Sequence, residues 1–155
     1  MFYAYAGSNL VALVMLALSW GWRNLGRLSF VLLFFLAGLY NTRTAFVRPE
    51  EYVSLIRLSY GSLALRLFLR HTTAIIAAIG IGQLVIAVLV SLRNLPVTLG
   101  LLGAVLFLMG ITPLGAAAGF PTTLIMAIAA LLLLRTRYTS TLWNLWQHHH
   151  LHSSF

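Results

Sequence analysis

The chain has 155 residues, of which 61% are hydrophobic and only 8% are charged, and its mean hydropathy is +0.94. Soluble domains carry roughly a quarter charged residues, so this composition excludes an ordinary water-soluble domain and predicts a surface that faces lipid. The formal charge of +8 comes from arginine; because the arginines are spread between apolar segments, we expect them to contact anionic lipid headgroups and not nucleic acid.

The first predicted element is an apolar helix over residues 1–22, with Tyr and Trp residues near both of its ends. Aromatic residues in these places are typical of the two interfaces of a membrane-spanning helix. The segment lacks a basic start, and its first charge, Arg23, follows the apolar run, so we expect a retained membrane helix and not a cleaved signal sequence. Because the apolar core is short, a tilted or interfacial placement stays open.

A short basic turn over residues 23–27 precedes the second predicted helix, which begins at Leu28 and continues to about Phe46. The next segment, residues 48–70, differs from the rest of the chain. Its Glu50 and Glu51 suit the positive start of a helix, and apolar residues recur in it at helical spacing. We interpret this segment as an amphipathic connector in the membrane interface, with a lid or docking surface over the bundle as the alternative.

Three further apolar runs predict three membrane-spanning helices: residues 75–92, residues 97–114, and a run that follows Pro121 and ends at Leu134. Small residues in the first two runs would let helix backbones approach closely in lipid. These residues are Ala74, Ala78 and Gly82 for the first run, and Gly100, Gly103 and Gly110 for the second. Residues 115–119 match a GxxxG pattern but lie between two prolines, so we interpret them as a tight turn and not as a dimer face.

Residues 138–155 form a polar tail with several histidines, which we expect to lie in the interface. Alternating the predicted helices across a membrane gives five arginines on each side, so the positive-inside rule does not set the orientation. One side carries Arg23, Arg27, Arg93, Arg135 and Arg137, and the other carries Arg43, Arg48, Arg57, Arg66 and Arg70.

From Arg27 to Arg135 the chain resembles the DoxX-like membrane proteins. The matching motifs are RLSFVLLFFLAGLYN at 27–41, RPEEY at 48–52, GIGQLVIAVLV at 80–90, LGLLGAVLFLMGITPLG at 99–115 and FP at 120–121. The resemblance implies a four-helix core over residues 23–137, to which residues 1–22 add a helix. It also implies a cytoplasmic start for the helix at Leu28, an outer connector, and in some members a link to quinone-coupled sulfur oxidation or redox defence. The family often has Glu where this chain has Gln83, which puts proton handling in doubt.

Gln83 is the strongest candidate for a functional residue inside the apolar runs, because a buried amide needs a hydrogen-bond partner. It either bonds a neighbouring helix or binds a quinone. Arg66, Arg70 and His71 are candidates at one mouth of the bundle, where they would bind a quinone carbonyl or a lipid phosphate; ordinary interfacial snorkelling is the alternative.

Metal and haem sites find little support in the sequence. His71 as a haem or pigment ligand has no recognisable partner motif. His148 and His152 would share a helical face, but no nearby carboxylate or cysteine completes a ligand set, so we expect no metal.

The composition also argues against catalysis. The chain has neither Asp nor Cys, and its only acidic residues, Glu50 and Glu51, point about 100° apart on a helix. We therefore expect an all-α, polytopic transmembrane bundle of the cell membrane, of bacterial inner-membrane type. It would anchor or stabilise a larger complex, with membrane lipids and other membrane subunits as partners. A quinone-linked oxidoreductase component, holding quinone or bound lipid, is the alternative; a solute or ion pathway ranks last, because the runs lack ionisable groups.

Overall fold

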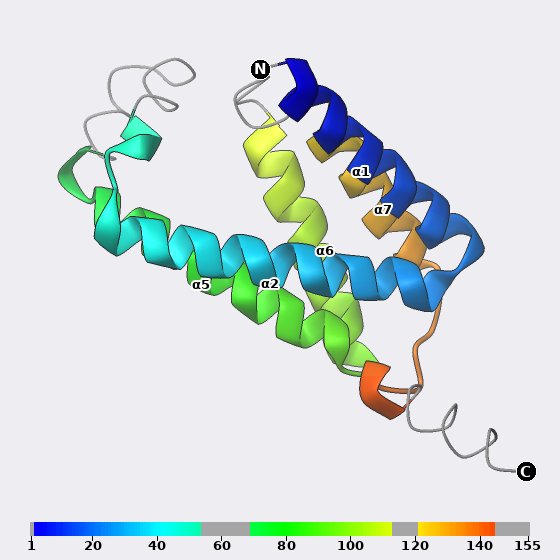
Figure 1. Cartoon of the computed structure of the whole chain (residues 1–155). Coiled ribbons are helices and arrows are strands. Elements are labelled where there is room, and N and C mark those ends of the chain that lie inside the picture. The colour runs from blue at the N-terminus through cyan, green and yellow to red at the C-terminus, as the bar shows by residue number, and fades with distance from the viewer. Residues whose placement is uncertain (1, 54–68, 113–120, 145–155) are drawn as a thin grey trace, which may run out of the picture.

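The computed structural model of the chain describes residues 2–53, 69–112 and 121–144, with side chains from residue 6 onward. Within these ranges the protein is helical and contains no strand, which confirms the expected all-α class. Its long helices are α1 (Phe2–Gly21), α2 (Arg23–Val47), α5 (Thr72–Ser91), α6 (Leu95–Ile111) and α7 (Thr122–Leu134) (Figure 1). Each predicted apolar run therefore corresponds to one helix.

Successive helices run in opposite directions and pack as a closed set (Figure 1). The α2 helix lies along α5, α5 contacts α6, α6 contacts α7, and α1 packs against both α7 and α2. Since direct contact between α2 and α7 is slight, α1 closes the bundle between them. The helix that the DoxX-like resemblance treats as an addition is thus an integral wall of the bundle.

The alternation of helices creates two ends. We call them the Tyr52 end, where α2 finishes and α5 and α7 begin, and the Tyr138 end, where α5 and α7 finish. The described arginines divide between these ends as the alternation of helices predicts. Arg23, Arg27, Arg93, Arg135 and Arg137 lie at or next to helix termini of the Tyr138 end, and Arg43, Arg48 and Arg70 at those of the Tyr52 end.

The closest approach of α2 and α5 occurs at Gly38 and Gly80. A Cβ atom on Gly80 would lie 2.7 Å from the backbone nitrogen of Thr42 and 3.0 Å from the carbonyl oxygen of Gly38. A Cβ on Gly38 would lie 2.9 Å from the carbonyl oxygen of Gly80. Neither position has room for a side chain, so glycine sets the distance between the two backbones.

The small-residue stripe predicted on α5 makes no helix contact within the bundle. Ala74, Ala78 and Gly82 are all exposed, and a Cβ on Gly82 would meet nothing within 4 Å. Residues 80 and 82 differ by about 200° around a helix, so the face that carries Gly80 packs inward while the face that carries Gly82 points out. On α6, Gly100 and Gly103 do approach α5, but a Cβ on Gly110 would again meet nothing within 4 Å.

The core is apolar and draws on every long helix. Phe34 of α2 stacks on Phe30, with ring centroids 6.4 Å apart, and meets Phe107 of α6 edge-on at 5.7 Å. Small residues of α7, such as Ala127, Ala129 and Ala130, let the neighbouring helices pack tightly around it. A smaller cluster around Ala45 and Ile76 fills the space between α2 and α5 near the Tyr52 end.

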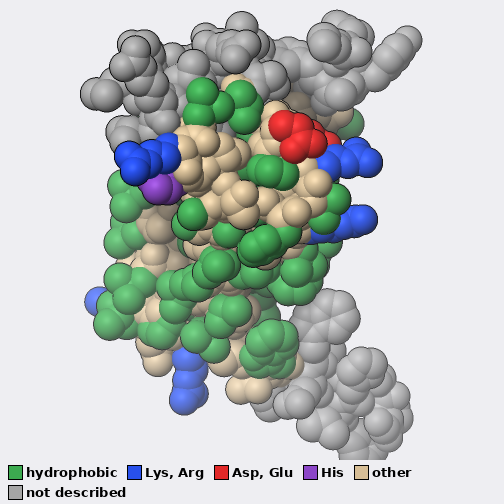
Figure 2. All heavy atoms as spheres, turned by 90° about the vertical axis from the view of Figure 1, so that its left-hand side faces the viewer, with side chains coloured by type: hydrophobic (Ala, Val, Ile, Leu, Met, Phe, Trp, Pro, Cys, Tyr) green, Lys and Arg blue, Asp and Glu red, His purple; other side chains and the backbone are tan. Residues whose placement is uncertain are grey.

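The outer surface is apolar as well. Large hydrophobic side chains are exposed along every long helix, among them Leu36 at 62%, Ile81 at 54% and Leu106 at 73%. Figure 2 shows a broad hydrophobic region on one face, with basic side chains above and below it. Two helices, α2 and α5, are long and apolar enough to cross a membrane, whereas α6 and α7, with 17 and 13 residues, are shorter apolar helices.

One predicted turn is helical. The basic segment 23–27 belongs to the first turns of α2, which follows α1 after the single residue Trp22. The close fit of Gly26 against Ser19 permits this tight corner, because a Cβ on Gly26 would lie 2.7 Å from the Ser19 Cα. Most of the predicted connector (48–70), the GxxxG match, and His148 and His152 lie outside the described residues.

The different surroundings of the glycines on α5 give a matched test. We expect Gly80→Ala to lower the free energy of unfolding by about 1–3 kcal/mol, because the added methyl group forces α2 and α5 apart. Gly82→Ala places the same methyl group on the same helix in open space, and it should leave stability unchanged or slightly raised. The measurement is the free energy of unfolding of the wild type and of both variants in the same detergent. Equal effects of the two changes would contradict the contact at Gly80.

Candidate functional site

Gln83 lies at the interface between α2 and α5 and is 5% exposed. Its Oε1 accepts a hydrogen bond of 2.6 Å from the Asn41 amide nitrogen of α2. The Asn41 Oδ1 accepts in turn from the Tyr52 hydroxyl. We call this chain of three side chains the Gln83 network; it gives the buried amide a protein partner, as the interpretation of Gln83 as an interhelical hydrogen bond predicts.

Tyr52 connects the Gln83 network to the surface at the Tyr52 end. Burial, followed by the charges of Tyr40 and Glu51, raises the pKa of the Tyr52 phenol above its ordinary value, so it stays protonated and donates. Next to it, Glu51 forms a 3.5 Å ion pair with Arg48 and accepts a 3.3 Å hydrogen bond from the Tyr40 hydroxyl. This ion pair is exposed and worth little to stability, but it neutralises one of the chain's two carboxylates.

The residues predicted to form one quinone or lipid site are not brought together within the described part of the chain. Arg70 and His71 are exposed at the start of α5, while Gln83 is buried at least 12 positions further along the helix. At 1.5 Å per residue, this separation is about 18 Å. Arg66 lies outside the described residues.

Arg27 is the polar residue whose importance the sequence reasoning missed. Its side chain is fully buried, at 0% exposure, although it lies only in the second turn of α2. Its Nε donates to the Val90 carbonyl at 2.6 Å, its Nη1 to the Ser140 carbonyl at 3.0 Å, and its Nη2 to the Leu92 carbonyl. The guanidinium also lies 4.9 Å from the centre of the Tyr138 ring.

These bonds give Arg27 a structural role. The carbonyls of Val90 and Leu92 are at the C-terminus of α5, where backbone acceptors lack partners within the helix and a positive charge is favourable. The bond to Ser140 also holds the segment that follows α7 against α2. A sequence signal did exist: Arg27 is the last charge before a long apolar run, and the chain offers it no nearby acid.

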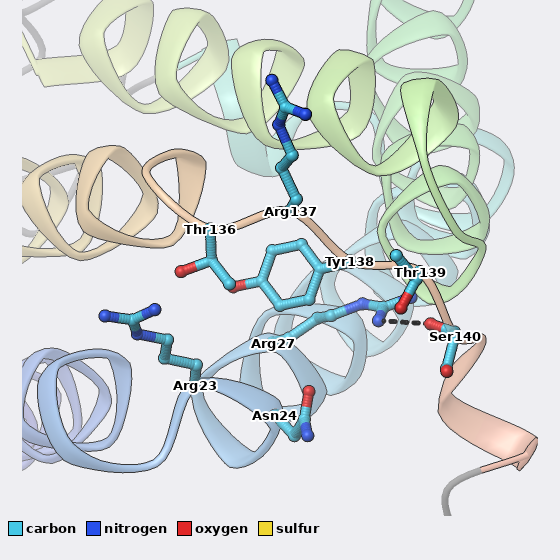
Figure 3. Close-up of a pocket in the computed structure, with 8 residues that line it drawn as sticks. All are labelled: Arg23, Asn24, Arg27, Thr136, Arg137, Tyr138, Thr139 and Ser140. Atoms are coloured by element: carbon cyan, nitrogen blue, oxygen red, sulfur yellow. Dashed lines mark hydrogen bonds between the residues drawn. The ribbon is translucent and has the colours of Figure 1, made fainter.

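A hollow of about 260 Å³ lies next to Arg27 at the Tyr138 end (Figure 3). Arg23, Arg27 and Arg137 line it together with Thr136, Tyr138 and Ser140. Tyr138 is only 7% exposed, and its backbone carbonyl accepts a 2.7 Å hydrogen bond from the Asn94 N–H. Asn94 has φ 58°, a left-handed conformation, which turns its N–H toward this segment.

The Gln83 network and the hollow next to Arg27 offer amide, hydroxyl and guanidinium groups with which to bind a ligand. In the described residues no three His, Cys, Asp or Glu side chains come together to hold a metal ion. Glu50 and Glu51, the only acidic side chains of the chain, are both near the Tyr52 end, so neither can pair with Arg27. The described lining of the hollow at the Tyr138 end therefore contains three arginines and no acidic side chain to balance them.

Comparison with known proteins adds no assignment. No family model, no curated protein and no solved structure matches this chain. The resemblance to DoxX-like proteins stays a prediction that rests on the motifs quoted above.

The Gln83 network predicts an energetic coupling between α2 and α5. We expect Gln83→Leu to lower the free energy of unfolding by about 1–2 kcal/mol, because the Asn41 amide loses its acceptor. Asn41→Leu combined with Gln83→Leu should cost less than the sum of the two single changes, by about 0.6 kcal/mol or more. As a control, Asn41→Leu is combined with Ser91→Ala in place of Gln83→Leu. These two changes should be additive, since the Ser91 hydroxyl bonds to the Val88 carbonyl of its own helix. Strict additivity of the Asn41 and Gln83 changes in denaturation experiments would contradict the network.

Proposed function

We propose that the protein is a multi-pass integral membrane protein that anchors or stabilises a larger membrane complex, without catalysis of its own. The observation that carries this proposal is the band of exposed hydrophobic side chains between two ends that hold the arginines. In water such a surface would be unfavourable by about 25 cal/mol per Å². Soluble monomers seldom expose a continuous apolar patch of more than a few hundred Å², so lipid or protein has to cover this one.

The helix lengths are compatible with this proposal. By their residue counts α2 is about 38 Å long and α5 about 30 Å, which matches the roughly 30 Å hydrocarbon core of a bilayer. The shorter α6 and α7, at about 26 Å and 20 Å, have part of their length shielded by neighbouring helices. Short spans are tolerated where the bilayer thins or where protein surrounds the helix.

A role as a subunit is supported by the outward face of α5. Ala74, Ala78 and Gly82 form an exposed strip of small residues, and small residues let a helix of another polypeptide approach closely in lipid. The described residues provide hydrogen-bonding groups and arginines, but the chain has no Asp or Cys with which to build a nucleophile or a proton relay. Binding and packing are therefore the activities that this surface supports best.

A quinone-linked component of an oxidoreductase is the second candidate. It is favoured by one observation, the hydrogen-bonded series of Tyr52, Asn41 and Gln83, which brings two donors to the interface between α2 and α5. A quinone carbonyl, which only accepts hydrogen bonds, would have to displace Gln83 from the Asn41 amide or Asn41 from the Tyr52 hydroxyl. The main proposal needs no such displacement, and we rank it first for that reason.

Because the chain has no cysteine, single introduced cysteines can test the membrane placement. We expect Arg93→Cys and Arg135→Cys to react with a membrane-impermeant maleimide from one side of intact membranes, and Glu50→Cys from the other. Ile81→Cys should not react until the membrane is dissolved, although Ile81 is 54% exposed in the isolated chain, because lipid would cover it. Rapid labelling of Ile81→Cys in intact membranes would contradict the proposal.

The role as a subunit predicts a partner. After extraction in a mild detergent, native mass spectrometry should find the chain together with at least one different polypeptide, and a harsher detergent should release it as a single chain. A protein that appears only alone or as a homo-oligomer would contradict the anchoring role. A stoichiometric quinone that is lost in Gln83→Leu would favour the second candidate instead.

A further inference from the structure

The described residues that line the hollow at the Tyr138 end provide hydrogen-bond donors and positive charge, and none of them is acidic. Arg23, Arg27 and Arg137 line it, and the chain's acidic side chains are at the opposite end. Its volume of about 260 Å³ far exceeds the ~30 Å³ that one water molecule occupies in the liquid. There is room for a small anionic group together with some water.

Two hydroxyl groups in the hollow have no hydrogen-bond partner among the described residues apart from each other. The Tyr138 hydroxyl and the Thr136 Oγ1 are both buried and near each other, and a contact between them leaves at least one of the two O–H groups without an acceptor. Tyr138 as a whole is 7% exposed. A buried hydroxyl without a partner is unfavourable by about 1–3 kcal/mol, which indicates that a ligand or solvent completes this site.

The arginines contribute in different ways (Figure 3). Arg23 is exposed, and its side chain lies on the same side of the hollow as the Tyr138 and Thr136 hydroxyls, whereas Arg137 extends away from them. Arg27 passes beneath the Tyr138 ring and is fixed by three backbone carbonyls. Arg27 therefore supplies a fixed charge, and Arg23 supplies a charge that can adjust to a ligand.

The phenol of Tyr138 is held in the form that donates. Burial raises the pKa of Tyr138, against the opposing influence of the adjacent Thr136 hydroxyl and of the charges of Arg27 and Arg23. At neutral pH the group is therefore a neutral O–H donor surrounded by positive charge.

We propose that this hollow binds a phosphate group, with the Arg23 guanidinium and the Tyr138 and Thr136 hydroxyls as its donors and Arg27 as a fixed charge behind them. A phosphate offers several acceptor oxygens to separate donors, and guanidinium groups bind it through charge-assisted, bidentate hydrogen bonds. The phosphate belongs either to a lipid headgroup or to a soluble molecule. The lipid source rests on the membrane placement proposed above, and the soluble source does not.

The test uses the purified full chain in a mild detergent and three probes: phosphatidylglycerol, phosphatidylcholine and inorganic phosphate. Phosphatidylcholine is the lipid control, because its phosphate carries a compensating choline. Native mass spectrometry gives the dissociation constants of the lipids. The thermal unfolding midpoint reports on inorganic phosphate, since a ligand that binds the folded state raises it.

We expect at least one of the two anionic probes to bind, and Tyr138→Phe and Arg23→Gln each to weaken that binding by roughly tenfold, as the loss of one hydrogen bond to a charged group implies. Tyr138→Phe removes one oxygen and keeps the ring against Arg27, so its unfolding midpoint without ligand should match the wild type. Arg93→Gln is the matched control, because Arg93 is an exposed arginine of the same end that does not line the hollow.

Preference for phosphatidylglycerol over both other probes assigns the site to a lipid headgroup, and binding of inorganic phosphate with the same sensitivity to Tyr138→Phe assigns it to a soluble phosphate. Either result supports the proposal. Equal binding of both lipids with no effect of inorganic phosphate would overturn it, as would anion binding that Tyr138→Phe and Arg23→Gln leave unchanged. These readouts do not depend on a partner polypeptide, so failure of the anchoring role would be seen separately.

Discussion

The side chain of Arg27 connects three parts of the bundle that are distant in sequence. Its guanidinium joins the start of α2 to the C-terminus of α5 and to the segment that follows α7. A buried charge is unfavourable unless its donors are satisfied, and here backbone carbonyls satisfy them in place of a carboxylate. Because those carbonyls belong to a helix end and a turn, the position of Arg27 fixes how α2 begins and how α5 and α7 finish at the Tyr138 end.

At the opposite end the same two helices are joined by different means. Gly38 and Gly80 bring the backbones of α2 and α5 together, and the Gln83 network crosses the interface next to that contact. Thr122 of α7 donates a 2.9 Å hydrogen bond to Asn9 of α1, so the outer pair of helices is also held by polar side chains at its Tyr52 end. In lipid, where the hydrophobic effect gives no preference for helix contact, close packing and such hydrogen bonds provide the specificity.

The same features indicate where activity is to be sought. The faces between the ends present hydrocarbon side chains to the surroundings, which suits lipid or another membrane polypeptide. Among the described residues, two groups of polar side chains are the candidates for chemistry, namely the Gln83 network and the lining of the hollow next to Arg27. The three side chains of the first bond one another within the protein, whereas the second combines a cavity lined by arginines with two buried hydroxyls that have no partner apart from each other. The second is therefore the better place for an external ligand.

The sequence by itself determined the number of long helices and their approximate limits, because apolar runs interrupted by Arg, Asn, Pro and Gly are a local signal. It also predicted a protein partner for Gln83 as one of two alternatives. It did not reveal that Gly80 and not Gly82 makes the contact, or that Arg27 is buried. The distance of Arg70 and His71 from Gln83, in contrast, follows from the helix that the sequence predicts, because 12 residues of helix span about 18 Å. Helices that are apolar on every side carry no pattern that distinguishes the inward face from the outward one. Only the rotation of each helix in the packed bundle decided which side chains meet.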